Sequence, residues 1–235
     1  MQNHFVLEIT VETVDGALAA QRGGADRIEL CSQLAQGGLT PGTDLMRVVR
    51  RRVPLPLFAM IRPRAGDFVY SGAEFQVMQR DIETARGLGM NGIVLGILRE
   101  DRSVDVARTR QLVQLARPLP VTFHRAFDVS ADLRKSLEDV METGATRILT
   151  SGGAPTAPEG LPALAELLAA AGDGILIVPG GGIHPSNILR VAQESGAREF
   201  HSGLSSVVSR AERQWDRFEA EVRTLADLLR QKSGV

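Results

Sequence analysis

Cysteine is almost missing from this chain: Cys31 is the single thiol among 235 residues, which excludes an intrachain disulfide. Aromatic residues make up only 4% of the sequence, and 27 Lys+Arg balance 28 Asp+Glu. Neither base stacking nor attraction to an anionic surface is therefore favoured. No apolar run approaches the roughly 18 residues that span a bilayer, and the first residues lack the basic and apolar regions of a signal peptide. We therefore expect a cytoplasmic protein with neither nucleic acid nor a membrane as a partner.

What the chain does contain is a repeated junction. It recurs at residues 23–30, 88–95, 143–150 and 195–202, and each copy reads as a helix end, a glycine and a short apolar strand. The copies recur at roughly 50- to 65-residue intervals, about twice the length of one strand-plus-helix unit. Together with 43% hydrophobic residues, this spacing predicts one domain over residues 1–235, built from eight such units.

The expected strands are short and rich in Val, Ile, Leu and Phe, as strands covered on both faces are. They are Phe5–Val11, Arg27–Cys31, Leu57–Arg62, Gly92–Leu98, Val121–Arg125, Arg147–Ser151, Ile175–Pro179 and Glu199–Ser202. The clearest helical patterns between and after them are Glu74–Leu88, Val104–Ala116, Leu133–Thr143, Pro162–Ala171 and Ala211–Lys232. Eight strands alternating with helices in this length predict a (β/α)₈ barrel of the TIM type.

Active sites of such barrels lie at the carboxyl ends of the strands, so the polar residues found there are the candidate catalytic residues. They are Glu8, Glu29, Arg62, His124, Arg125, Asp128 and His201. Because buried charges need partners, we expect the two glutamates to meet Arg62 or Arg125 in the barrel mouth. The alternative is that these side chains form only a satisfied ion-pair plug.

Glycine-rich loops follow the last strands, where barrels often hold an anion on backbone N–H groups. The candidate anion-binding residues are Ser151, Gly152, Gly180, Gly181, Gly182, Ser202 and Gly203. The alternative is that these glycines only permit close packing at the rim. Cys31 is open to three interpretations: a small buried apolar residue, an activated nucleophile, or a soft ligand for Cu(I) with Met60 or a histidine beside it.

Several long blocks resemble the CutC family, which is associated with copper homeostasis. They are Glu29–Cys31, Gly37–Pro41, Ile61–Ser71, Val121–Asp128, Arg147–Gly152 and Glu199–His201. The resemblance runs from the first strand to about residue 203. It implies a TIM-type barrel, a cytoplasmic location, self-association into a homo-oligomer and a link to Cu(I), but no established reaction.

One position departs from the family pattern. Val69 stands where the family commonly has a second cysteine, so of the implied pair of copper-binding thiols this chain keeps only Cys31. A soft ion thereby loses half of its thiolates.

One hypothesis is that the chain is a degenerate barrel with an apolar mouth, which serves only as a scaffold. Two other functions remain open. The first is the binding and handling of Cu(I) through Cys31. The second is an enzyme of the isomerase, epimerase or aldolase type acting on a small phosphorylated or anionic polyhydroxy compound. In it Arg62 and Arg125 orient a carbonyl or carboxylate, and a glutamate acts as base with His124 as acid. A divalent ion on Glu29, Asp128 and the histidines is a variant of this hypothesis.

Overall fold

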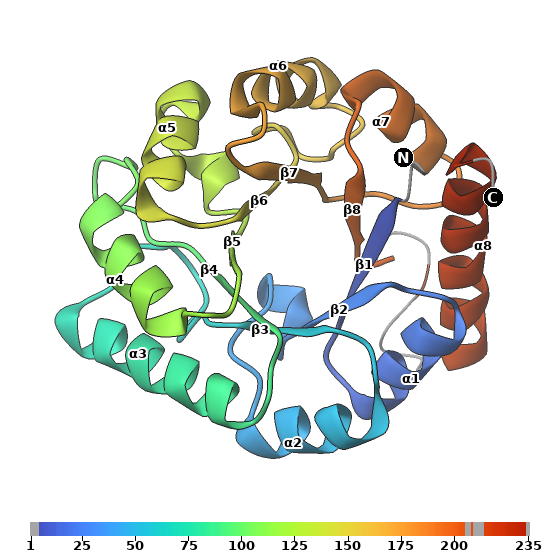
Figure 1. The fold of residues 1–235 in the computed structure, drawn as a ribbon, viewed down its shortest axis with the longest axis horizontal. Helices are drawn as coiled ribbons and strands as arrows, with labels where there is room; N and C mark the ends of the chain where they lie inside the picture. The colour runs from blue at the N-terminus through green and yellow to red at the C-terminus, as the bar shows by residue number, and fades with distance from the viewer. Residues whose placement is uncertain (1–4, 205–207, 209–213, 234–235) are drawn as a thin grey trace.

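Eight parallel strands form the centre of the computed structural model, which describes residues 5–204, 208 and 214–233. The strands are β1 (Val6–Val11), β2 (Arg27–Leu30), β3 (Leu57–Met60), β4 (Gly92–Leu95), β5 (Val121–Phe123), β6 (Arg147–Thr150), β7 (Leu176–Pro179) and β8 (Glu199–Ser202). From β1 to β7 each strand pairs with the next in chain order, and β8 pairs with β1. A parallel bridge between Gly180 and His201 joins the two remaining edges, so the sheet is a nearly closed barrel (Figure 1).

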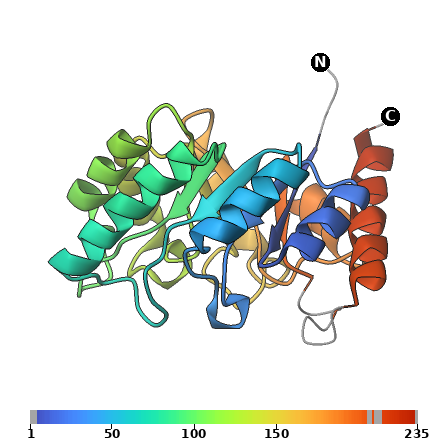
Figure 2. The ribbon, with the colours of Figure 1, turned by 90° about the horizontal axis from the view of Figure 1, so that it is seen from below.

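The helices form a ring outside the strands (Figure 1). They are α1 (Val14–Arg22), α2 (Thr43–Arg52), α3 (Gly72–Gly87), α4 (Val106–Ala116), α5 (Leu133–Thr143), α6 (Leu161–Ala171), α7 (Ile188–Ser195) and α8 (Trp215–Ser233). Two short 3₁₀ turns, η1 (Leu34–Gln36) and η2 (Phe127–Val129), follow β2 and β5. In Figure 2, η1 projects from one end of the barrel, which is the end where the strands finish. Among the described residues, no helix combines the length and apolarity needed to cross a bilayer.

The repeated junctions fold as the sequence predicts. Gly24, Gly89, Gly144 and Gly196 all have a positive φ, between 77° and 91°. Residues with a Cβ rarely adopt this conformation, so each glycine lets the chain leave a helix and turn into the next strand. The TIM-type barrel expected from these junctions is confirmed.

The strands end earlier than the sequence predicts in several places, and this difference shapes the mouth. Arg62, His124 and Ser151 were expected as the last residues, or nearly the last, of β3, β5 and β6, but all three lie beyond the ladder. Their side chains therefore leave the apolar strands and stand in the loops at the barrel end. The start of the last helix, expected at residue 211, falls outside the described residues, which resume at 214.

The lowest layer of the barrel interior comes from the first residues of the even-numbered strands, as alternate strands supply the layers of such barrels. These residues are Arg27, Gly92, Arg147 and Glu199. The Phe58 ring lies over Gly92, where a Cβ atom would come within 2.2 Å of it. The guanidinium groups of Arg27 and Arg147 stack on this ring, 5.1 and 4.2 Å from its centroid. The floor of the barrel is thus charged but tightly packed.

Candidate active site

Glu8 is the anionic centre of the barrel floor. Its Oε2 accepts hydrogen bonds from Arg27 and, at 3.2 Å, from Arg147, and its Oε1 lies 2.9 Å from His201 Nδ1. Both arginines also contact Glu199. Burial raises the pKa of Glu8, but the two cations outweigh this effect and hold the pKa well below its ordinary value. Glu8 is therefore ionised at neutral pH and anchors its neighbours.

The prediction that the two glutamates pair with Arg62 or Arg125 is wrong. Glu8 pairs with Arg27 and Arg147, not with Arg62 or Arg125. The strand register explains the outcome, because Glu8 lies opposite Arg27 in the β1–β2 pair. Arg62 and Arg125 stand higher, in loops beyond the strand ends.

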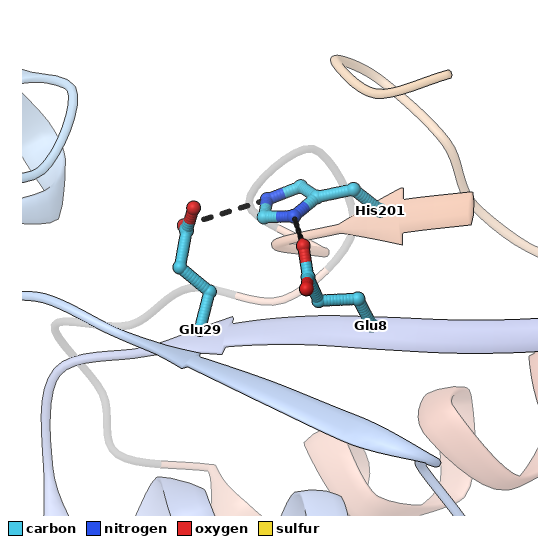
Figure 3. A group of neighbouring side chains, drawn as sticks. All are labelled: Glu8, Glu29 and His201. Carbon is cyan, nitrogen blue, oxygen red and sulfur yellow. Dashed lines mark hydrogen bonds and ion pairs between the residues drawn. The ribbon is translucent and has the colours of Figure 1, made fainter. Parts of the chain in front are cut away.

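His201 lies between the two glutamates, with Glu8 at Nδ1 and Glu29 Oε2 at 3.7 Å from Nε2 (Figure 3). The register again places them, since Glu8 lies opposite His201 and Thr10 opposite Glu29. Burial raises the pKa of Glu29. Burial lowers the pKa of His201, but the Glu29 and Glu8 carboxylates outweigh it, so this pKa is raised. With Glu8 fixed as an anion, Glu29 and His201 form an acid–base pair poised to exchange one proton.

His124 is a neutral donor. The backbone N–H of Ala126 donates to its Nδ1 at 3.2 Å, so the proton of the neutral ring is on Nε2. Burial, followed by the charge of Arg62, lowers the pKa of His124 to about 3. The imidazolium is therefore absent at neutral pH, and the general-acid role expected of His124 stays a prediction for the neutral ring. The ring instead offers an N–H group, and its Nε2 is buried with no hydrogen-bond partner among the described residues. Gly96 makes room for this ring, since a Cβ there would lie 2.6 Å from it.

We expect His124→Asn to flatten the acid side of the stability profile. Between pH 6.5 and about 3 the unfolded chain protonates this imidazole but the folded chain does not. His124 therefore makes unfolding easier as pH falls through this window, by about 1.4 kcal/mol per pH unit. Asparagine keeps an acceptor for the Ala126 N–H and removes the titration. Urea unfolding at several pH values checks this, and an unchanged slope in the variant would contradict the assignment.

Arg62 has an unusual set of partners. Its Nη groups donate to the carbonyl oxygens of Gln36, Gly38 and Gly66 at 2.8–3.3 Å, and its side chain is buried. Its Nε–H is also buried and has no acceptor among the described residues. Three carbonyls fix the plane of the guanidinium group but carry no negative charge to compensate it.

These groups face one cavity of about 840 Å³ at the barrel mouth, a size typical of small-molecule sites. Glu29, Arg62, His124 and His201 line it together with the Phe68 ring. Oε1 of Glu29 is buried without a hydrogen-bond partner among the described residues, as are Arg62 Nε and His124 Nε2. One acceptor and two donors are thus left for a ligand. A mouth so charged is not the apolar mouth of a mere scaffold.

Asp128 and Arg125 form a second cluster at the barrel mouth, and Arg125 is part of the cavity lining. The Asp128 carboxylate accepts hydrogen bonds from the Thr150 hydroxyl, from the backbone N–H groups of Ser151 and Gly153, and from Arg125 Nε. The N–H of Gly152 bonds to the Thr150 hydroxyl. Ser151 and Gly152, predicted as anion-binding residues, therefore have their N–H groups occupied within the chain. The Asp128 carboxylate is thus the anion that this loop binds. Asp128 is not in the group of possible metal ligands that contains Glu29, so the predicted divalent metal site on Glu29 and Asp128 is not formed by the described residues.

The other predicted anion-binding residues divide into two groups. Gly181, Gly182 and Gly203 line the cavity, whereas Gly180 and Ser202 do not. The Gly180 N–H bonds to a β6 carbonyl, and the Ser202 hydroxyl donates to the carbonyl of Ile183. Gly181 packs so closely on Arg125 that a Cβ atom would lie 2.8 Å from its guanidinium group. Close packing therefore accounts for Gly181. An anion-binding role stays a prediction for Gly182 and Gly203, which also line the cavity.

Cys31 lies below the mouth in a small apolar cluster with Phe58, Met60 and Val94. Its side chain is fully buried, and its thiol donates weakly to the carbonyl of Val11 at 3.6 Å. A Cβ atom at Gly38 would touch both Cys31 Sγ and Met60 Cε, at 3.5 and 3.4 Å. The side chains of Cys31 and Met60 are therefore neighbours, and both carry the soft sulfur atom that Cu(I) prefers.

One group of carboxylates and imidazole has the spacing of a metal site. Glu8, Glu29 and His201 each offer a ligand atom, and these atoms lie within 4.8 Å of one another. Their oxygen and nitrogen atoms are not ligands that select Cu(I). Glu8 also bonds to two arginines and to His201, so an ion bound here would share this carboxylate with them.

Sequence reasoning missed the residues that hold this site in place: Arg27, Phe68, Arg147 and Glu199. The signal for three of them was present. Strand side chains alternate between faces, so Arg27 shares the inward face of Glu29, and Glu199 that of His201. Arg147 begins its strand in the same way as Arg27. Phe68 lies in a loop and carries no such signal.

Comparison with known proteins identifies the family. The CutC family model matches residues 5–206, most of the chain. The chain belongs to the CutC family. A CutC family protein of Chromobacterium violaceum is 48% identical over 208 residues, covering 88% of this chain and 84% of that protein. The human copper homeostasis protein cutC homolog is 47% identical over 204 residues, covering 87% of this chain and 75% of that protein.

Solved structures agree with this assignment. CutC of Streptococcus agalactiae superposes with a TM-score of 0.80 at 32% identity, covering 84% of this chain and 98% of that one. A phosphoribosylanthranilate isomerase of Pyrococcus furiosus has a TM-score of 0.63 at 13% identity, covering 95% and 100% of the two chains. That second likeness shows the barrel fold alone.

Proposed function

We propose that this CutC protein is an enzyme that moves a proton on a small anionic carbonyl compound bound in the barrel mouth. The observation that carries the proposal is that three residues lining one cavity, Glu29, Arg62 and His124, each have a buried polar atom with no hydrogen-bond partner in the described part of the chain. An unpartnered buried polar group destabilises a protein by about 1–3 kcal/mol, so three in one cavity are explained by a ligand that completes them.

The roles follow from the charges. Glu29 takes a proton from a carbon next to the carbonyl group, and His201 holds or returns it, with Glu8 orienting the imidazole through Nδ1. Arg62 and His124 donate to ligand oxygens. Neutral imidazole is suited to this task, since it stabilises a developing oxyanion without first releasing a proton to water. Such chemistry is common to isomerases, epimerases and aldolases.

Solvent exchange tests the proposal without knowledge of the natural substrate. The protein is incubated in D₂O with a panel of small carbonyl compounds, including pyruvate, dihydroxyacetone phosphate and ribose 5-phosphate. Proton NMR then follows the loss of signal at carbons next to the carbonyl. We expect catalysed exchange on at least one compound, retained after dialysis against EDTA, since the proton pair needs no metal. Absence of exchange over the whole panel would contradict the proposal.

Copper handling is a second candidate function, favoured by the adjacent thiol and thioether side chains of Cys31 and Met60. The names of the human and mouse relatives, copper homeostasis protein cutC homolog, point the same way. The two sulfur-bearing residues would hold Cu(I), although family members with a second cysteine have one more thiolate than this chain. A cytoplasmic location and self-association into a homo-oligomer, which the family resemblance implies, stay predictions.

An anaerobic competition titration with Cu(I) tests that candidate. If the two residues bind Cu(I), Cys31→Ser abolishes one-to-one binding and Met60→Leu weakens it at least about tenfold, because each removes a soft ligand of an already small set. His124→Asn, which leaves both sulfur atoms in place, is the matched control. Binding that is indifferent to Cys31→Ser would remove the copper function from this site.

A further inference from the structure

Two N–H groups of cavity-lining residues have no acceptor within the part of the chain that the structure describes. They are Arg62 Nε–H and His124 Nε2–H, and their side chains are only 5% and 4% exposed. Both side chains contact the Phe68 ring, which lies 4.7 Å from the Arg62 guanidinium carbon and 5.0 Å from the His124 ring centroid, and the Arg62 charge is close enough to lower the pKa of His124. Because Arg62, Phe68 and His124 all line the cavity, a ligand bound there lies beside this group of side chains.

Arg62 also differs in charge balance from the other buried arginines. Arg27 and Arg147 each contact Glu8 and Glu199. In the described part of the chain, Arg62 is the one buried guanidinium with no carboxylate within ion-pair distance. A buried cation without an anion is costly, and an anionic ligand removes that cost.

The number of donors indicates which anion fits. One guanidinium N–H and one imidazole N–H match the two oxygens and the single charge of a carboxylate. A phosphate group brings three acceptor oxygens and up to two charges, and asks for more donors than this wall supplies. Arg125, the other arginine of the mouth, is already paired with Asp128.

Resting on the function proposed above, we propose that Arg62 and His124 form a carboxylate-binding subsite, and that the substrates of the barrel mouth are small 2-oxo carboxylates. The carboxylate occupies the Arg62–His124 wall. The adjacent ketone makes the next C–H acidic, and that proton is the one transferred to Glu29. Arg62 and His124 thereby fix which end of the substrate faces the proton-transfer pair.

Binding of pyruvate and of inorganic phosphate, measured separately by calorimetry at neutral pH, tests this inference. Arg62→Lys keeps the charge and removes the Nε–H, and His124→Asn keeps the acceptor for the Ala126 N–H and removes the Nε2–H. We expect each to raise the Kd for pyruvate at least about tenfold. Arg108→Lys is the matched control, because Arg108 also donates to carbonyl oxygens and stacks on a phenylalanine but lies outside the cavity. It should leave the Kd unchanged.

Several outcomes overturn the inference. They are no pyruvate binding by the wild type, equal binding by all variants, or a preference for phosphate that is lost in Arg62→Lys. Thermal unfolding shows whether Arg62→Lys still folds. If it does not, the Kd of His124→Asn for pyruvate tests the inference. Proton exchange on a phosphorylated carbonyl compound without pyruvate binding would refute the carboxylate subsite and spare the proposed function. Pyruvate binding that depends on Arg62, without proton exchange on any compound, would support the carboxylate subsite and refute the proposed enzymatic function.

Discussion

Replacing Glu29 by glutamine is expected to slow solvent exchange on the active compound by at least about 100-fold, the usual contribution of a positioned general base. Glutamine has nearly the same shape and still reaches into the cavity, but it cannot accept the proton. His201 lies 3.7 Å away and keeps its bond to Glu8, so the rest of the site is retained. Proton NMR of the exchange reaction measures the effect directly.

Glu12→Gln is the control for the loss of charge. Glu12 stands at the rim of the same cavity, and its carboxylate accepts the backbone N–H of Leu34 at 2.7 Å, a bond that a glutamine oxygen can keep. This variant changes the charge of the mouth by the same unit without touching the Glu29–His201 pair. Equal slowing in Glu12→Gln and Glu29→Gln would mean that net charge, not proton transfer, sets the rate.

Replacing Glu8 by glutamine is expected to lower the free energy of unfolding by about 3–5 kcal/mol, because it removes one partner from a buried ion-pair network. Arg27 and Arg147 would keep only Glu199, which is more exposed than Glu8. In a chain of this length the melting temperature should fall by about 10 °C or more. Urea unfolding at neutral pH gives the free energy.

Acid should weaken the same network in the wild type. The pKa of Glu8 is lower in the folded chain than in the unfolded one, so its contribution is complete above the ordinary glutamate pKa and is lost as pH falls toward the folded value. Glu142→Gln is the comparison for stability, since it breaks an exposed pair with Arg110 that contributes about 1 kcal/mol or less. If Glu8→Gln were no more destabilising than this surface variant, the floor of the barrel would not depend on its buried anion.

The barrel was predictable because its signals are local. A glycine after each helix and a short apolar strand after each glycine repeat along the chain, and the positive φ values of Gly24 and Gly144 show why. Most of the candidate side chains at the strand ends do meet at one mouth for the same reason, since parallel strands bring their carboxyl ends together. Glu29, Arg62, His124 and His201 all line the cavity.

The pairing of those side chains was not predictable from position along the chain alone. It depends on strand register, which sets Glu8 opposite both Arg27 and His201. It also depends on where each strand stops, which lifts Arg62 out of reach of the glutamates. The neutral state of His124 needs a third kind of information, namely its burial and the backbone N–H at Nδ1.

If the buried atoms of the mouth that lack a partner among the described residues serve to bind a ligand, the fold should not depend on them. The free energy of unfolding of Glu29→Gln, compared with the wild type at neutral pH, tests it most directly. Because burial raises the pKa of Glu29, its ionised form destabilises the folded chain at this pH, and glutamine removes that cost. We expect an unchanged or higher free energy of unfolding. A loss of more than about 2 kcal/mol would show that Glu29 belongs to a structural plug and not to a ligand site.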